Sequence, residues 1–103
     1  MAKGYWIAHV SAEDNANFQS DAYQAYVSGA RPAFEAHNAK FLARGGDFVV
    51  CEGDDMGSRH VVIEFESLAA AKACYNSDTY QEAKKHRVAV SNAKIVLLEG
   101  MDD

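Results

Sequence analysis

Residues 59–71, which read RHVVIEFESLAAA, constrain the fold more than any other part of the chain. The β-branched and aromatic residues that lead up to Phe65 are typical of a strand. Ser67 stands where a helix N-cap belongs, and the alanines after it favour a helix. Glu64 places a charge inside the strand, and such a charge is costly to bury unless it is paired. The segment therefore predicts a central strand that carries one acid and leads into a helix.

Two further segments have helical periodicity. Apolar residues recur at helical spacing from Ser20 to about Asn38, where Ser20 or Asp21 can cap the first turn. Because Pro32 lacks an amide donor, we expect a kink or a short break near residues 29–32. The helix after Ser67 breaks at residues 76–78, where Ser77 can cap a second helical piece.

Strands fill most of the remainder. Residues 4–10 (GYWIAHV) and 94–99 (KIVLLE) have strand composition. Residues 40–52 predict a strand interrupted by a bulge or bend at residues 45–46, because two adjacent glycines weaken a strand. Residues 53–58 (GDDMGS) predict a hairpin turn.

The order strand, helix, strand, strand, helix, strand fits a ferredoxin-like βαββαβ sandwich of the α+β class. Such a fold has a four-stranded antiparallel sheet with two helices on one face. The length of 103 residues suits a single domain over residues 1–103.

Both faces of the predicted sheet are apolar, although two helices can cover only one. Alternation places six residues on the helix face, namely Trp6, Ala8, Val10, Val61, Ile63 and Phe65. It places Tyr5, Ile7, His9, Val62 and Glu64 on the other face, although alternation alone allows the block to be inverted. A sheet with one solvated face should carry polar residues there. We therefore expect a homodimer packed sheet to sheet.

Charge and composition argue against several classes of protein and site for this chain. A net charge of −5 argues against nucleic-acid binding. No apolar run reaches the ~18 residues of a membrane span, and the N-terminal residues lack the pattern of a signal peptide, so a cytoplasmic location is expected. Cys51 and Cys74 are isolated and predict buried free thiols. We expect no metal site and no cofactor, because neither a ligand cluster nor a haem axial-ligand signature is present.

Five stretches resemble the domain-of-unknown-function family 1330. They are YQAYV (23–27), KFLARGG (40–46), VVIEFESLAAA (61–71), YNSDTY (75–80) and LLEG (97–100). The resemblance implies a dimeric α+β barrel of two ferredoxin-like subunits. The wider superfamily includes cofactor-free monooxygenases, haem-degrading enzymes, dehydratases and plain ligand binders, so the resemblance alone selects no chemistry.

Five polar residues are candidates for a ligand pocket: His9, Arg44, Glu64, Tyr80 and Arg87. Glu64 paired with Arg44 is either a general base or ligand anchor, or a structural ion pair. His9 is either an acid–base group near pH 7 or a hydrogen-bonded structural histidine. Arg87 can clamp a carboxylate with help from Tyr80, or Tyr80 is core and Arg87 pairs with a neighbouring acid.

These residues predict a site for a small acidic molecule, either between the helices and the sheet or at the dimer mouth. Activity of the cofactor-independent acid–base or oxygenase type is one alternative. A non-catalytic structural or stress-related homodimeric binding module is the other. Tyr23 and Tyr26 are interpreted as packing residues.

Overall fold

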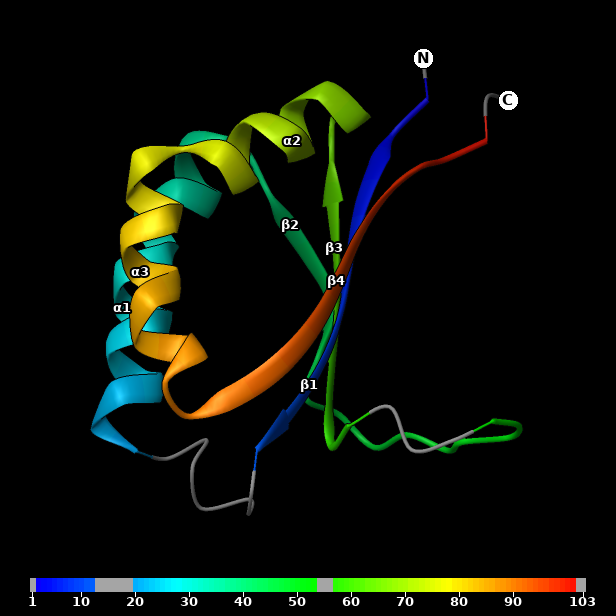
Figure 1. Cartoon of the computed structure of the whole chain (residues 1–103). Coiled ribbons are helices and arrows are strands. Elements are labelled where there is room, and N and C mark those ends of the chain that lie inside the picture. The colour runs from blue at the N-terminus through cyan, green and yellow to red at the C-terminus, as the bar shows by residue number, and fades with distance from the viewer. Residues whose placement is uncertain (1, 13–19, 54–56, 102–103) are drawn as a thin grey trace.

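The computed structural model describes residues 2–12, 20–53 and 57–101, which form four strands and three helices (Figure 1). The elements in chain order are β1 (Gly4–Ala12), α1 (Asp21–Ala36), β2 (Lys40–Arg44), β3 (Arg59–Phe65), α2 (Leu68–Asn76), α3 (Asp78–Val88) and β4 (Ser91–Glu99).

The strands form one antiparallel sheet in the order β2-β3-β1-β4. All three helices lie on one side of it, and α1 and α3 run alongside each other (Figure 1). This confirms the predicted ferredoxin-like α+β fold, with the second predicted helix divided into α2 and α3. Within the described residues, no helix has the length and apolar character needed to cross a bilayer.

Serine hydroxyls begin all three helices, as the sequence predicted. The side chains of Ser20, Ser67 and Ser77 accept hydrogen bonds from amides three residues later, at 3.1–3.2 Å. Each serine satisfies one amide that the first helical turn leaves without a partner. Of the kink or short break predicted near residues 29–32, the break is absent, because α1 runs without interruption from Asp21 to Ala36 with Pro32 inside it.

The strand predicted over residues 40–52 is only partly correct. β2 ends at Arg44, and its register against β3 shifts between Phe41 and Ala43. The chain then turns at Gly45, whose φ of +70° favours glycine. Residues 47–51 are exposed and belong to no strand, so that part of the prediction is wrong. Residues 54–56 of the predicted turn lie outside the described residues.

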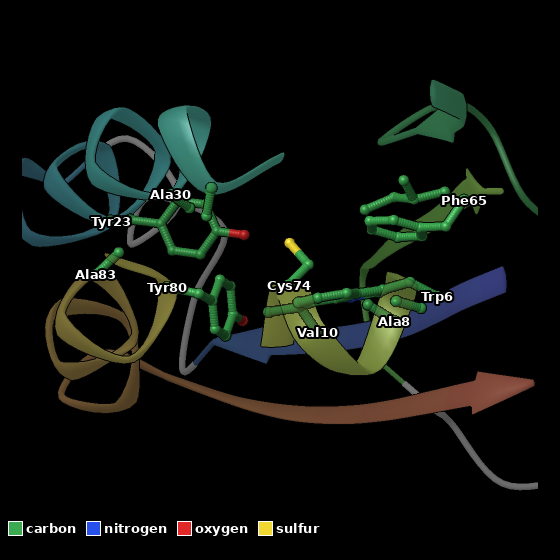
Figure 2. Packing of buried hydrophobic residues seen from close by; sticks show 12 residues of the cluster. Trp6, Ala8, Val10, Tyr23, Ala30, Phe65, Cys74, Tyr80 and Ala83 are labelled. Atoms are coloured by element: carbon green, nitrogen blue, oxygen red, sulfur yellow. The ribbon is translucent and has the colours of Figure 1, made fainter. Parts of the chain in front are cut away.

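Aromatic side chains build the core around Trp6, which is 1% exposed (Figure 2). Its ring centroid lies 5.0 Å from that of Tyr80 and 5.1 Å from that of Phe34, both in edge-on contacts. Such geometry adds to the stabilisation that burial alone provides. Cys74 is buried in this core as predicted, whereas Cys51 lies on the exposed segment after β2, so its predicted burial is wrong.

The predicted division of the sheet into two faces is confirmed. Trp6, Ile63 and Phe65 are buried under the helices. On the opposite face, Val96 and Leu98 remain 53% and 52% exposed, and they pair in register with Ile7 and Tyr5 of β1 (Ile7 with Val96, Tyr5 with Leu98). We call this second face the outer face; Tyr5, Ile7, Val96 and Leu98 form an apolar area on it.

Candidate functional site

A pocket of about 500 Å³ lies between α1 and the helix face of the sheet. Side chains from all four strands and from α1 and α3 contribute to its walls. The apolar part of the lining includes Trp6, Val10, Val27, Phe34, Phe41, Ile63 and Ile95. The polar part consists of Tyr23, Gln24, Tyr26, Arg31, Glu35, Arg44, Arg59 and Arg87.

The floor of the pocket follows one row of residues across the sheet. Arg44 pairs in register with Val61, Val61 with Ala8, and Ala8 with Ile95. All four residues line the pocket. Three strand spacings of about 4.8 Å place the backbones of Arg44 and Ile95 about 14 Å apart. The pocket therefore extends from one edge strand to the other.

Arg87 is the buried cation of this pocket and is only 4% exposed. Its guanidinium carbon lies 5.2 Å from the centre of the Tyr26 ring, and its positive charge lies close to the hydroxyl of Tyr80 as well. Its Nε atom is buried without a hydrogen-bond partner. No carboxylate in the described ranges forms an ion pair with it. A buried charge of this kind is costly unless an anion compensates it.

Tyr26 of α1 and Tyr80 of α3 lie beside this guanidinium. Their hydroxyl oxygens lie 3.1 Å apart, so one donates to the other. Burial raises the pKa of Tyr26 well above its ordinary value, and the neighbouring Tyr80 raises it further. Burial likewise raises the pKa of Tyr80. Both side chains are therefore neutral phenols at physiological pH, which donate and accept hydrogen bonds but do not act as bases.

Tyr23 lies near both Arg87 and a second cation, Arg59. Burial raises the pKa of Tyr23, the neighbouring Tyr26 adds to the effect, and the positive charges of Arg59 and Arg87 partly offset it. Arg59 also hydrogen-bonds with Tyr23. Its guanidinium passes so close to Gly45 that a Cβ atom on Gly45 would lie 2.6 Å from Nη1. A side chain at position 45 would displace the Arg59 guanidinium, and the positive φ of Gly45 favours glycine there.

Arg44 lies at the opposite end of the pocket from Arg87. It is exposed, and its guanidinium carbon sits 4.7 Å from the centre of the Phe41 ring. Arg31 and Glu35 of α1, which are also exposed, line the same pocket. Four arginines and one glutamate thus surround a pocket in a chain whose net charge is −5. This arrangement attracts anions.

A smaller cavity of about 370 Å³ adjoins α3 and β4. It shares Arg87 and Ile95 with the main pocket, and its other lining residues include Tyr75, Lys84, Ser91 and Asn92. Lys84 donates a hydrogen bond of 3.0 Å to the Tyr75 hydroxyl. Arg87 therefore forms part of the wall of two cavities.

The five candidate residues from the sequence do not form one cluster. Arg44 and Arg87 line the pocket, and Tyr80 lies in the core behind Tyr26. Glu64 lies on the other side of the sheet. It pairs in register with Lys40 and Tyr5, so the predicted Glu64–Arg44 ion pair is wrong. The register shift in β2 is the reason, because one extra residue turns Arg44 to the helix face.

His9 also lies outside the pocket, on the outer face. Its Nδ1 atom is 2.8 Å from Nδ1 of His60, the residue opposite it in register. The His60 ring in turn contacts Phe48, with ring centroids 4.3 Å apart. The structure thus gives His9 a hydrogen-bonded partner on the surface opposite the pocket. In the part of the chain that the structure describes, no three metal-ligating side chains converge.

Sequence reasoning missed six polar residues of the pocket: Tyr23, Gln24, Tyr26, Arg31, Glu35 and Arg59. Arg59 could have been found, because alternation along the strand places it on the same face as Val61 and Ile63. The two tyrosines follow the apolar periodicity of α1, so nothing in the pattern separates them from core residues.

Comparison with solved structures shows the same fold in proteins of low sequence identity. A protein of unknown function from Rhodopseudomonas palustris is 22% identical over 99% of this chain and 85% of its own, with a TM-score of 0.73. A dimeric ferredoxin-like protein of unknown function from Jannaschia sp. CCS1 is 16% identical over 93% and 97% of the two chains, with a TM-score of 0.70. SnoaB, a cofactor-independent oxygenase from Streptomyces nogalater, is 9% identical over 100% and 97%, with a TM-score of 0.64.

Family assignment comes from the sequence itself. No curated protein matches the chain. The profile described as "Domain of unknown function (DUF1330)" matches residues 3–101. Because this match covers nearly the whole chain, the protein belongs to the DUF1330 family.

Proposed function

We propose that the protein binds a small organic anion in the arginine-lined pocket. The observation that carries this proposal is Arg87, a buried guanidinium that faces the pocket with no carboxylate partner among the described residues. A ligand carboxylate can satisfy it with a pair of charge-assisted hydrogen bonds.

The remaining lining supports an organic anion over an inorganic one. Trp6, Phe34 and Phe41 offer apolar and aromatic walls, and Tyr26 adds a neutral hydroxyl beside Arg87. Pockets of about 300–1,000 Å³ with apolar walls and a few polar groups are typical of small-molecule sites. An aromatic or alicyclic acid fits both parts of this lining.

The pocket favours binding over acid–base catalysis by its own side chains. Its described lining contains no histidine, and its one carboxylate, Glu35, is exposed. The tyrosines keep their protons because burial raises their pKa values. His9 and Glu64, which sequence reasoning offered as acid–base groups, face away from it.

A second candidate function is cofactor-independent oxygenation of an anionic substrate. The likeness in fold to SnoaB and to an antibiotic biosynthesis monooxygenase of Caulobacter crescentus supports it. In this reading the arginines stabilise the electron-rich anion of the substrate. Oxygen uptake on adding a hydroxynaphthoate in metal-free buffer tests it, with Arg87→Met as the comparison; the candidate fails if no uptake occurs.

We also propose a homodimer that packs through the outer face. The helices leave one apolar area of β1 and β4 uncovered, which consists of Tyr5, Ile7, Val96 and Leu98. Structural neighbours are described as dimeric ferredoxin-like proteins. An identical apolar surface on a second copy satisfies both observations.

Binding can be tested with a matched pair of ligands. Trp6, the one tryptophan of the chain, lines the pocket and reports occupancy by fluorescence. We expect 2-naphthoate to bind at least about tenfold more tightly than the neutral 2-naphthamide, as a charge-assisted hydrogen bond contributes ~1.5–3 kcal/mol. Equal affinity for the acid and the amide contradicts the proposal without any variant.

Variants then locate the site. Arg87→Met should abolish the preference for the acid, and Arg87→Lys should retain part of it because a point charge remains. Lys72→Met, which removes an exposed cation of α2 away from both cavities, is the matched control. If Arg87→Met folds and still prefers the acid as strongly as Lys72→Met does, Arg87 is not the anchor.

A further inference from the structure

The positive charge of the pocket is distributed over its length. Arg87 lies at the β4 side, where it shares the lining with Ile95. Arg44 lies on β2, the opposite edge strand. Three strand spacings, or about 14 Å of backbone, separate Arg44 from Ile95 along the row through Val61 and Ala8.

The two arginines also differ in depth. Arg87 is almost wholly buried, and Arg44 is exposed at the pocket surface. Apolar side chains fill the floor between them. Arg59 reaches toward Gly45, next to Arg44, and so adds positive charge at the outer end.

Among the described residues, the charges of Arg44 and Arg87 have no carboxylate partner. Neither Arg44 nor Arg87 forms an ion pair with any residue in the described ranges. Glu35, the one acid of the lining, lies on the exposed side of α1. A ligand with a single acidic group can satisfy only one end of the pocket.

We propose that the preferred ligand is a diacid, with one acidic group at Arg87, an aromatic or alicyclic spacer along the floor, and a second acidic group at Arg44. This inference rests on the proposed anion-binding function and specifies its ligand class. The inner acid is desolvated and supplies most of the affinity, whereas the outer acid forms a partly solvated ion pair and supplies selectivity.

The expected gain from the second acid follows from its exposure. Pairs in contact with solvent contribute about 0.2–1 kcal/mol, and the upper end of this range corresponds to about fivefold in affinity. We therefore expect the diacid to bind about fivefold more tightly than the monoacid of the same ring size at low salt. This difference should shrink as the ionic strength rises, because exposed pairs are screened.

A double-mutant cycle between ligand and protein tests the proposal by isothermal titration calorimetry. The probes are benzoate and terephthalate for a short spacer, and 2-naphthoate and naphthalene-2,6-dicarboxylate for a long one. We expect Arg44→Met to remove the preference for at least one diacid, and to weaken monoacid binding less than diacid binding. Arg87→Met should weaken monoacid and diacid alike, and Lys72→Met should change neither.

The outcomes separate this inference from the function on which it rests. If monoacids bind and depend on Arg87, but neither diacid binds more tightly than its monoacid, the diacid assignment is wrong and anion binding stands. The same holds if Arg44→Met weakens monoacid and diacid equally. If no acid binds more tightly than its neutral amide, both proposals are wrong.

Discussion

The hydroxyl oxygens of Tyr26 and Tyr80 lie 3.1 Å apart, and the guanidinium of Arg87 lies 5.2 Å from the centre of the Tyr26 ring. Two neutral phenols and one cation thus form a polar cluster inside an otherwise apolar interior. The pair joins α1 to α3 and fixes the position of the buried charge.

Removing one hydroxyl of this pair should lower stability. Tyr80→Phe leaves the Tyr26 hydroxyl without its phenolic partner, and we expect the free energy of unfolding to fall by about 1 kcal/mol in urea titrations. Tyr5→Phe on the outer face is the matched control, because no hydrogen bond joins the Tyr5 hydroxyl to any described residue. Equal stability of the two variants would mean that the 3.1 Å contact contributes nothing.

Alkaline pH should lower the free energy of unfolding, because three buried groups have raised pKa values. Burial raises the pKa of Cys74 to about 11 and raises those of Tyr26 and Tyr80 above the ordinary value of about 10. The folded state retains these protons when the unfolded chain releases them. These groups therefore contribute their full stabilisation at a pH below their pKa values in the unfolded chain. This stabilisation is lost as the pH rises through their higher pKa values in the folded protein.

The measurement for this effect is the free energy of unfolding at a series of pH values from about 8 to 11. We expect a steady fall from about pH 9, where the unfolded thiol ionises, with a steeper fall above about pH 10. Tyr26→Phe should flatten the upper part of this profile, and Tyr5→Phe should not. A profile that is level to pH 11 would contradict the assignment of these groups as buried and neutral.

Gly45 and Gly46 should respond differently to the same substitution. Gly45→Ala forces a side chain into a positive-φ position and against the Arg59 guanidinium, so we expect a loss of about 1 kcal/mol in stability and weaker binding of 2-naphthoate. Gly46→Ala meets no atom within 4 Å and has no such φ, so both quantities should stay near wild type. Equal effects of the two substitutions on binding would show that Arg59 does not contribute to binding of 2-naphthoate.

A charge on the outer face should dissociate the proposed dimer. We expect wild-type protein at micromolar concentration to have the mass of a dimer in light scattering. Val96→Asp places an unpaired carboxylate on β4 within the apolar surface and should give a monomer. Val88→Asp, at a similarly exposed valine of α3, should remain dimeric. A wild-type monomer, or dissociation by both variants, would contradict packing through the outer face.

The sequence predicted those parts of the fold that depend on local pattern. The bounds of β3 and the caps at Ser67 and Ser77 were correct, because alternation and capping are local properties. The position of Arg44 was not predictable in the same way. A one-residue shift in the pairing of β2 decides which face that side chain occupies, and this shift depends on contacts with β3.

The candidate site was only partly predictable for a related reason. Arg87 was found because arginine and tyrosine at helical spacing indicate carboxylate recognition. Glu64 and His9 were chosen because a polar residue in a strand is conspicuous, but on this sheet the conspicuous residues face away from the pocket. Tyr23 and Tyr26 were passed over because their chemistry depends on Arg59 and Arg87, which are distant in sequence.

The shared position of Arg87 in two cavities has a consequence for competition between them. Arg87 and Ile95 line both the pocket beside α1 and the smaller cavity beside α3 and β4. A change of side chain at position 87 therefore alters the walls of both cavities at once. An anion that holds the guanidinium in one cavity makes it unavailable to the other, so the two cavities share a single cation.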